Sequence, residues 1–197
     1  MELALSLYRL GRSSLVNSYL IEEEAGLTII DAGLPGHWKD LGRELAAMGR
    51  SVDDVRALLL THSDVDHVGF AERLRRDHMV PVYVGEADAV EARVRSKPPA
   101  ARDPKRVWPL VIPRGRWPIT CPGWRRSSVG DAMATRSVTT GIVGPALGPF
   151  TVDPVRALAS LAALDGLTAR WVLPGHGDPW TGGLPEALGI IRGRRQD

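Results

Sequence analysis

The hydrophobic and polar positions in the first half of the chain alternate between a strand-like and a helix-like period. Short apolar or β-branched runs bounded by turn residues predict strands, and apolar residues three or four positions apart predict helices. The expected strands are Val16 to Glu22, Leu27 to Asp31, Val55 to Leu60 and Val80 to Val84, and the expected helices are Trp38 to Met48, Val68 to Asp77 and Glu86 to Val94. The first two strands are separated by a Glu-Ala-Gly turn, which predicts a hairpin. This alternation indicates an α/β fold.

The pattern stops after Ser96 and returns at Asp153. Between Pro98 and Trp124 the chain has seven prolines and three tryptophans, with no strand or helix period. Because proline lacks a backbone donor, we expect residues 98–128 to be irregular, with few regular strand pairings. The later part is expected to form a helix, a strand and a closing helix, over Asp153 to Leu167, Arg170 to Leu173 and Pro185 to Arg192.

The composition is that of an ordinary globular protein, and 197 residues predict one domain over 1–197. No apolar run approaches the roughly 20 residues that span a bilayer, so a membrane association is not expected. The first ten residues lack the ordered regions of a signal peptide, so export is not indicated. A single cysteine, Cys121, excludes an internal disulfide framework and favours a reducing, cytoplasmic location.

Basic residues are concentrated in one segment, although the net charge is only +2. Ten Lys and Arg residues lie between Ala92 and Ser128, against one acid, Asp103. Such a segment is either a nucleic-acid surface or a solvated, poorly ordered stretch. It lacks helical spacing and an RNA-binding aromatic motif, so we favour the second interpretation and expect no nucleic-acid partner.

Candidate chemistry lies directly after the apolar strand that ends at Leu60, in the sequence His62-Ser63-Asp64-Val65-Asp66-His67. Imidazole and carboxylate are ligands that zinc and similar divalent metals accept. Without a cation, two neighbouring carboxylates would repel each other and would be costly to remove from water. The alternative is an exposed loop whose histidines cap the next helix. Clustering of ligand types at a strand end favours the metal.

Thr61 to Gly69 resembles the metallo-β-lactamase superfamily signature T-H-x-H-x-D-H-x-G, with Asp64 where the second histidine usually stands. Three further landmarks follow in the family's order; they are the segments Ile29 to Gly33, Val129 to Ala132 and Leu173 to Gly177. The resemblance covers the chain outside about residues 98–128. It implies an αββα sandwich of two mixed β-sheets flanked by helices.

The resemblance also implies a glyoxalase II-like ligand pattern. The first metal position would be held by His62 and Asp64, the second by Asp66, His67 and His176, and Asp131 would bridge them. Asp66 would also orient the metal-bound hydroxide that attacks the substrate, and is the expected catalytic residue. The expected cofactor is Zn²⁺, one or two ions per chain, with iron and manganese left open because Asp64 is a harder ligand than histidine.

One family landmark is missing. The family has a Gly-His-Thr/Ser-Pro-Gly loop before the bridging aspartate, and its histidine completes the first metal position. No histidine lies between His78 and His176 in this sequence. The resemblance therefore implies an enzyme impaired at the first metal position, unless another ligand such as Cys121 replaces the histidine.

A shift of the reading frame is one hypothesis for the absence of this loop. Codons for residues 109–115, read one frame over, can encode Pro-Gly-His-Thr/Ser-Pro-Gly, at the place where the family has its loop. A compensated frameshift within residues 98–128, in the gene or in its sequencing, would explain the lost period, the surplus of Arg, Pro and Trp, and the absent histidine. Codons that cannot encode the loop in the shifted frame would exclude it.

Three functions are compatible with these residues. The leading one is a metal-dependent hydrolase of a small ester, thioester, lactone or related substrate. The principal alternative is a non-catalytic or single-metal relic of the fold, and a third is a nucleic-acid processing member that uses the basic segment. We expect Asp31, residues 62–67, Asp131 and His176 to converge at one edge, because each follows a predicted strand. The sequence does not indicate an oligomeric state.

Overall fold

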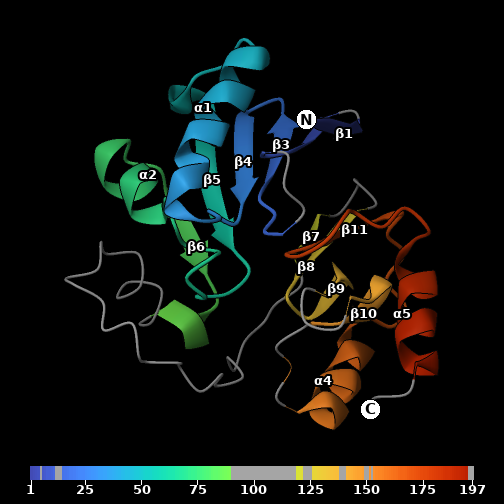
Figure 1. Cartoon of the computed structure of the whole chain (residues 1–197). Helices are drawn as coiled ribbons and strands as arrows, with labels where there is room; N and C mark the ends of the chain where they lie inside the picture. The colour runs from blue at the N-terminus through green and yellow to red at the C-terminus, as the bar shows by residue number, and fades with distance from the viewer. Residues whose placement is uncertain are drawn as a thin grey trace. The chain divides into compact units, whose positions relative to one another are not determined.

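The computed structural model describes residues 1–4, 6–11, 15–89, 119–121, 126–137, 141–148, 151 and 153–194 (Figure 1). The chain forms two compact units, Met1–Ala101 and Arg102–Asp197. The units are described separately below, and the single domain over 1–197 stays a prediction.

The first unit is built on a six-stranded sheet with the order β1-β2-β3-β4-β5-β6. Neighbouring strands from β1 to β4 are antiparallel, whereas β4, β5 and β6 run parallel. The strands are β1 (Glu2–Ala4), β2 (Leu7–Arg9), β3 (Tyr19–Glu23), β4 (Gly26–Ile30), β5 (Val55–Leu60) and β6 (Val82–Val84). The parallel strands all have their carboxyl ends at one edge, so the loops that follow them are neighbours.

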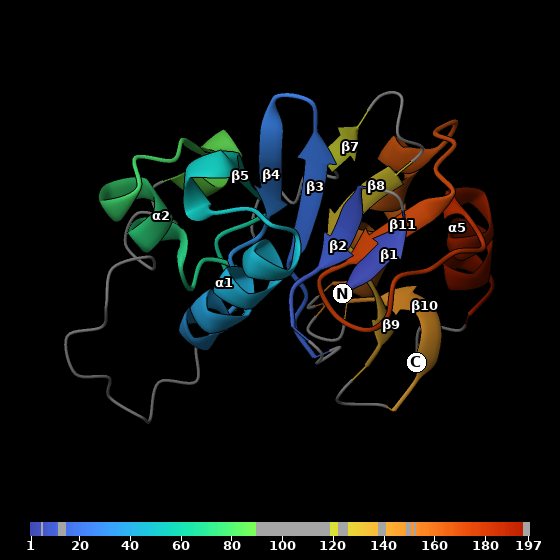
Figure 2. The ribbon, with the colours of Figure 1, turned by 90° about the horizontal axis from the view of Figure 1, so that it is seen from above.

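Two helices, α1 (Trp38–Ala47) and α2 (Ala71–Asp77), lie on the same side of this sheet (Figure 2). Leu41 and Leu45 of α1 and Leu74 of α2 pack in one core with Ile29 and Leu58 of the strands. The 3-10 helices of this unit are η1 (Pro35–His37), η2 (Val52–Asp54) and η3 (Glu86–Asp88). The other face of the sheet is also apolar and buried at Tyr19, Ile21 and Ile30. The strands therefore read as continuous apolar runs rather than as alternating ones.

The second unit contains a three-stranded sheet of order β11-β8-β7 and a two-stranded sheet of β10 and β9. Its strands are β7 (Ile119–Cys121), β8 (Arg126–Gly130), β9 (Met133–Arg136), β10 (Val143–Leu147) and β11 (Trp171–Pro174). Its helices are α4 (Pro154–Ser160), the 3-10 helix η4 (Leu161–Leu164) and α5 (Leu184–Gly193). β8 and β11 are parallel. Val129, Val172 and Ile191 pack in the core of this unit.

Most elements expected from the hydrophobic pattern are confirmed. The hairpin is β3 and β4, the apolar run is β5, and α1 and α2 occupy the first two predicted helices. The expected helix over Asp153 to Leu167 is instead α4 followed by the 3-10 helix η4. The expected helix over Glu86 to Val94 opens with η3, and residues 90–94 lie outside the described residues. Among the described residues, no helix is long and apolar enough to cross a membrane.

The expectation of irregular structure with few strand pairings over residues 98–128 stays a prediction, and one short pairing is present at its C-terminal end. β7 pairs antiparallel with β8, with Ile119 opposite Ser128 and Cys121 opposite Arg126. The prolines at 118 and 122 flank β7 instead of interrupting it, so they remove no donor from these three residues. This pairing bears against the frameshift hypothesis for residues 119–121 and 126–128 alone, and the hypothesis otherwise stays a prediction. Residues 98–118 and 122–125 lie outside the described part of the chain.

Leu58 tests the core of the first unit, because its side chain is fully buried in β5. Truncating it to alanine removes apolar contacts and leaves a cavity. We expect Leu58→Ala to lower the free energy of unfolding by about 2–5 kcal/mol in urea titrations. Leu15→Ala is the matched control, because Leu15 is 55% exposed, and should change it by about 0.5 kcal/mol or less. Equal effects of the two substitutions would contradict this account of the core.

Candidate metal centre

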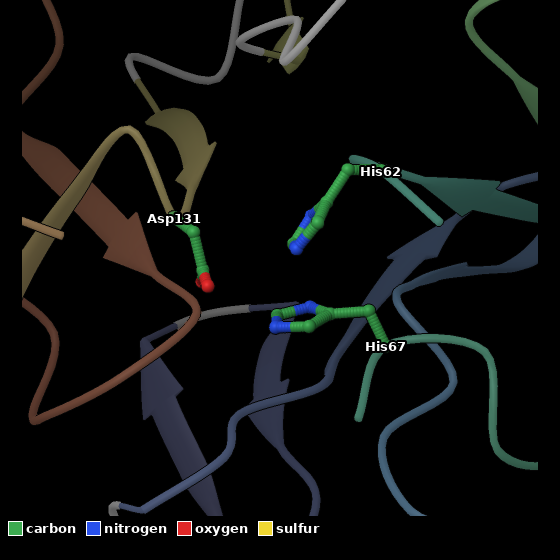
Figure 3. A group of neighbouring side chains, drawn as sticks. All are labelled: His62, His67 and Asp131. Atoms are coloured by element: carbon green, nitrogen blue, oxygen red, sulfur yellow. The ribbon is translucent and has the colours of Figure 1, made fainter. Parts of the chain in front are cut away.

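The loop after β5 presents two buried histidines. His62 and His67 are fully buried, whereas the side chains of Asp64 and Asp66 are 27% and 26% exposed. The two imidazole rings lie side by side with their centroids 4.1 Å apart (Figure 3). The loop is compact because the His67 amide donates to the Asp64 carbonyl at 2.9 Å. A buried pair of imidazoles beside two half-exposed carboxylates is a set of donors suited to a divalent metal.

Asp31 connects the end of β4 to this loop. Its carboxylate is 1% exposed and accepts three hydrogen bonds, from the Thr61 amide and hydroxyl, both at 2.7 Å, and from Nδ1 of His67 at 2.9 Å. The backbone at Asp31 is left-handed, with φ of 58°. Because a carboxylate only accepts, Nδ1 of His67 carries the ring proton. The lone pair of His67 is therefore on Nε2, the atom that would ligate a metal.

His62 has the same tautomer for a related reason. The Thr61 hydroxyl gives its single proton to Asp31, and its oxygen lies 2.9 Å from Nδ1 of His62. The hydroxyl can therefore only accept from His62, so Nδ1 carries the proton and Nε2 has the lone pair. One buried carboxylate thus sets the tautomer of both histidines, directly for His67 and through Thr61 for His62.

Residues 62–67 form the candidate metal-binding loop, called the metal loop below. Backbone hydrogen bonds hold this loop against the segment after β4. The Ala32 amide donates to the His67 carbonyl at 2.6 Å, and the Gly69 amide donates to the Gly33 carbonyl at 2.7 Å. A side chain at position 69 is sterically excluded, because a Cβ there would lie 2.2 Å from the carbonyl carbon of Leu34. The final glycine of the motif is thus required by this close approach of two backbones.

In the second unit, Asp131 and His176 follow two neighbouring parallel strands. Asp131 comes directly after β8, in the turn that Figure 3 shows, and His176 follows β11. Each is 5% exposed, and Nε2 of His176 lies 3.2 Å from Oδ2 of Asp131. The Gly175 amide donates to the Gly130 carbonyl at 2.9 Å, which ties the two strand ends together.

Hydrogen bonds from Thr135 of β9 fix the turn that carries His176. The Thr135 amide donates to the His176 carbonyl at 3.1 Å, and the Thr135 hydroxyl donates to the Asp178 carbonyl. Gly177 has φ of 90°, and a Cβ there would lie 2.3 Å from Oγ1 of Thr135 and 2.4 Å from the Arg136 amide nitrogen. Glycine is therefore required at this position for both its backbone conformation and its lack of a side chain.

The spacing of the donor atoms within each unit fits a divalent ion. A tetrahedral ion with bonds of about 2.0–2.2 Å separates its ligand atoms by roughly 3.3–3.6 Å. Three imidazole–carboxylate pairs lie near that value; the Nε2 to Oδ2 distances are 3.4 Å for His62 and Asp64, 3.9 Å for His67 and Asp66, and 3.2 Å for His176 and Asp131. The residues present therefore fit a metal in both chemistry and spacing.

The sequence-predicted ligands differ in their surroundings. The candidate metal-ligating groups among the described residues include His62, Asp66, His67, Asp131 and His176. Asp64 belongs to none of these groups, although its Oδ2 lies 3.4 Å from Nε2 of His62. The strand ends bring Asp31 to the metal loop and Asp131 to His176, as their placement predicted. That these residues ligate a metal stays a prediction.

The sequence did not predict the hydrogen bonds by which Thr61, Ser63 and Asp88 hold the candidate ligands in place. Thr61 orients His62, and Ser63 donates to a buried carboxylate, Asp88, at 3.0 Å. The only sequence signal for Asp88 is that it follows the strand β6, as Asp31 follows β4. An acidic residue after a strand is too common to be identified as functional from the sequence, without the contact between Ser63 and Asp88.

Comparison with known proteins identifies the family. The family model for the metallo-beta-lactamase superfamily matches residues 12–126, which is more than half of the chain. The chain belongs to the metallo-β-lactamase superfamily. Among curated proteins, this superfamily member is 42% identical over 75 residues to the uncharacterized protein YobT of Bacillus subtilis (strain 168), which is 38% of this chain and 31% of YobT. The match thus spans about a third of that relative.

Solved structures show the same fold. The mono-zinc form of the metallo-beta-lactamase FIM-1 from Pseudomonas aeruginosa has a TM-score of 0.66 at 15% identity, over 96% of this chain and 90% of that one. A metallo-beta-lactamase from Pontibacter korlensis has a TM-score of 0.64 at 15% identity, over 98% of each chain. The fold class expected from the sequence, an αββα sandwich of mixed sheets with flanking helices, is confirmed.

Gly177 provides a test of the His176 turn. We expect Gly177→Ala to destabilise the protein by more than the roughly 1–2 kcal/mol of a left-handed alanine, because the new methyl would also collide with Thr135. The measurement is the free energy of unfolding in urea. Gly166→Ala is the matched control, because Gly166 has φ of 79° and a Cβ there would meet no atom within 4 Å. If the two variants lose the same stability, the close approach to Thr135 is not what requires glycine.

Proposed function

We propose that this superfamily member is a metal-dependent hydrolase of a small ester, thioester, lactone or related substrate, and that His62, Asp64, Asp66, His67, Asp131 and His176 hold its metal. His62 and Asp64 would serve a first position, Asp66, His67 and His176 a second, and Asp131 both. The observation that carries the proposal is the pair of buried imidazoles whose Nδ1 protons are held by Thr61 and Asp31. Both Nε2 atoms then have lone pairs to offer to a cation.

A bound divalent ion would supply Lewis acidity and lower the pKa of adjacent water. The chain's own residues would orient the reacting water and the ligand side chains, and would accept a proton. Asp66 is half-buried, so its carboxylate can contact both the ligand cluster and solvent, and it would orient water and accept its proton. Asp31 keeps His67 in one tautomer and one ring orientation. The buried loop around His62 excludes bulk water from one side of the donors.

The two metal positions differ in their protein ligands. The second position has Asp66, His67, His176 and shared Asp131, a full set of four. The first has His62, Asp64 and shared Asp131, because the sequence has no histidine between His78 and His176. We therefore expect the second position to bind more tightly and hydrolysis to be weak.

A single-metal or non-catalytic protein is the second candidate. It is favoured by one observation, that Asp64 belongs to none of the candidate ligand groups among the described residues. The mono-zinc form of FIM-1 is a solved example of a one-zinc state in this fold. Zinc is the expected metal, and manganese or iron would suit the carboxylates of the first position.

Metal content tests the proposal. Protein purified without chelator should contain about one zinc per chain and hydrolyse ester or thioester substrates slowly, because the first position lacks a ligand. His67→Ala should lose the metal and the activity, whereas His78→Ala should keep both, because His78 is an exposed histidine that stacks on Trp38. The measurements are elemental analysis and initial rates. Absence of metal from the parent protein would refute the proposed function, and two tightly held ions with rapid turnover would refute the impairment.

Restoring the missing ligand tests the cause of the impairment. Replacing residues 109–115 by a Gly-His-Thr-Pro-Gly loop, with the register adjusted, should raise the zinc content toward two per chain and increase the rate. The same loop with alanine in place of its histidine is the control and should leave both unchanged. Equal metal content in the two loop variants would show that this position does not reach the metal.

A further inference from the structure

Asp88 is a buried carboxylate that the proposed mechanism does not use. It ends η3, just after the parallel strand β6, and is 2% exposed. Its Oδ1 accepts the hydroxyl proton of Ser63 at 3.0 Å. Its Oδ2 is buried and has no hydrogen-bond partner in the described part of the chain. Within the described residues, one oxygen of this carboxylate is thus removed from water without a donor to replace it.

Ser63 connects this carboxylate to the metal loop. It is 1% exposed and stands between His62 and Asp64, the two proposed ligands of the first position. Its hydroxyl donates to Asp88, across 25 residues of sequence. Fixing the Ser63 side chain fixes the backbone that carries both neighbours, so the hydrogen bond restrains the ligand side chains without touching a metal.

The energetics of the contact depend on whether a cation is present. A buried carboxylate is costly unless it is paired or fully hydrogen-bonded. Asp31 meets this requirement with three donors, whereas the carboxylate of Asp88 has Ser63 as its single donor among the described residues. A divalent cation held by the adjacent loop would offset the remaining cost through charge attraction in a site of low dielectric.

We propose that Asp88 is a positioning residue of the metal loop: it orients the loop through Ser63, and its buried negative charge is tolerated because a bound cation compensates it. The inference rests on the proposed function as a metal-binding protein. It predicts that one substitution weakens metal binding without lowering the stability of the metal-free chain. A merely structural hydrogen bond would change both in the same direction.

The experiment compares Asp88→Asn, Ser63→Ala and the double variant. Zn²⁺ affinity is measured by competition with a chromophoric chelator, and the thermal midpoint is measured on the metal-free chain. Asp88→Asn keeps an acceptor for Ser63 and removes the charge, so Zn²⁺ should bind about tenfold more weakly, while the metal-free midpoint should stay equal or rise.

Ser63→Ala removes the hydroxyl that donates to the Asp88 carboxylate, so it should weaken Zn²⁺ binding and lower the metal-free midpoint. Adding Asp88→Asn to Ser63→Ala should raise that midpoint again, because the charge left without a partner is gone. The two residues are coupled if Asp88→Asn raises the midpoint more in the Ser63→Ala chain than in the parent chain, whereas independent sites would give the same change in both.

A second serine–aspartate pair provides the matched control. Ser51 and Asp54 precede the other end of β5, where both are accessible to solvent and the Ser51 amide donates to Asp54 at 2.8 Å. Ser51→Ala and Asp54→Asn should leave Zn²⁺ affinity unchanged and lower the midpoint slightly through loss of the cap.

The outcomes separate the two proposals. If the parent chain binds Zn²⁺ and Asp88→Asn binds it equally well, or if Asp88→Asn lowers the metal-free midpoint, the role of Asp88 is overturned while the metal centre stands. If the parent chain binds no Zn²⁺, the proposed function fails, and the inference about Asp88 fails with it.

Discussion

The carboxylate of Asp31 has to be satisfied inside the protein, and the arrangement of the two buried histidines follows from how this is done. A buried carboxylate without donors costs several kcal/mol. Thr61 supplies two donors and His67 a third. These bonds join the end of β4 to the loop after β5 and leave both histidines with their lone pairs on Nε2. A single buried charge thereby determines a loop position, two ring orientations and two tautomers.

Parallel pairing provides the same organisation in the second unit. β8 and β11 are hydrogen-bonded neighbours that run in the same direction, so the residues that follow them meet at one edge. Asp131 and His176 are therefore brought within 3.2 Å although they are 45 residues apart. Gly177 permits the close approach of Thr135, which in turn fixes the His176 carbonyl. The positions of these two candidate ligands are consequences of sheet topology, and the glycines allow the turns to pack.

The two buried aspartates of the first unit illustrate different uses of a charge. Asp31 has three donors and stabilises the loop whether or not a metal is bound, whereas the Asp88 carboxylate has one donor in the described part of the chain. Full satisfaction produces rigidity, whereas a partly satisfied buried charge is costly unless an opposite charge lies near it. The fold by itself does not select a substrate. The chemistry of this superfamily member has to be inferred from such side chains.

The sequence by itself determined the elements long enough to show a period, and the ligand types. Runs such as Val55 to Leu60 have a recognisable pattern, and the loop from His62 to His67 is local, so its chemistry is visible in six consecutive letters. The short strands β1, β2, β7 and β9 show no recognisable pattern in the sequence, and only their pairing defines them. The hydrogen bonds of Asp31 to His67 and of Ser63 to Asp88 span 36 and 25 residues. Only the tertiary structure decided these contacts, because they form between loops whose meeting depends on the order of strands in the sheet.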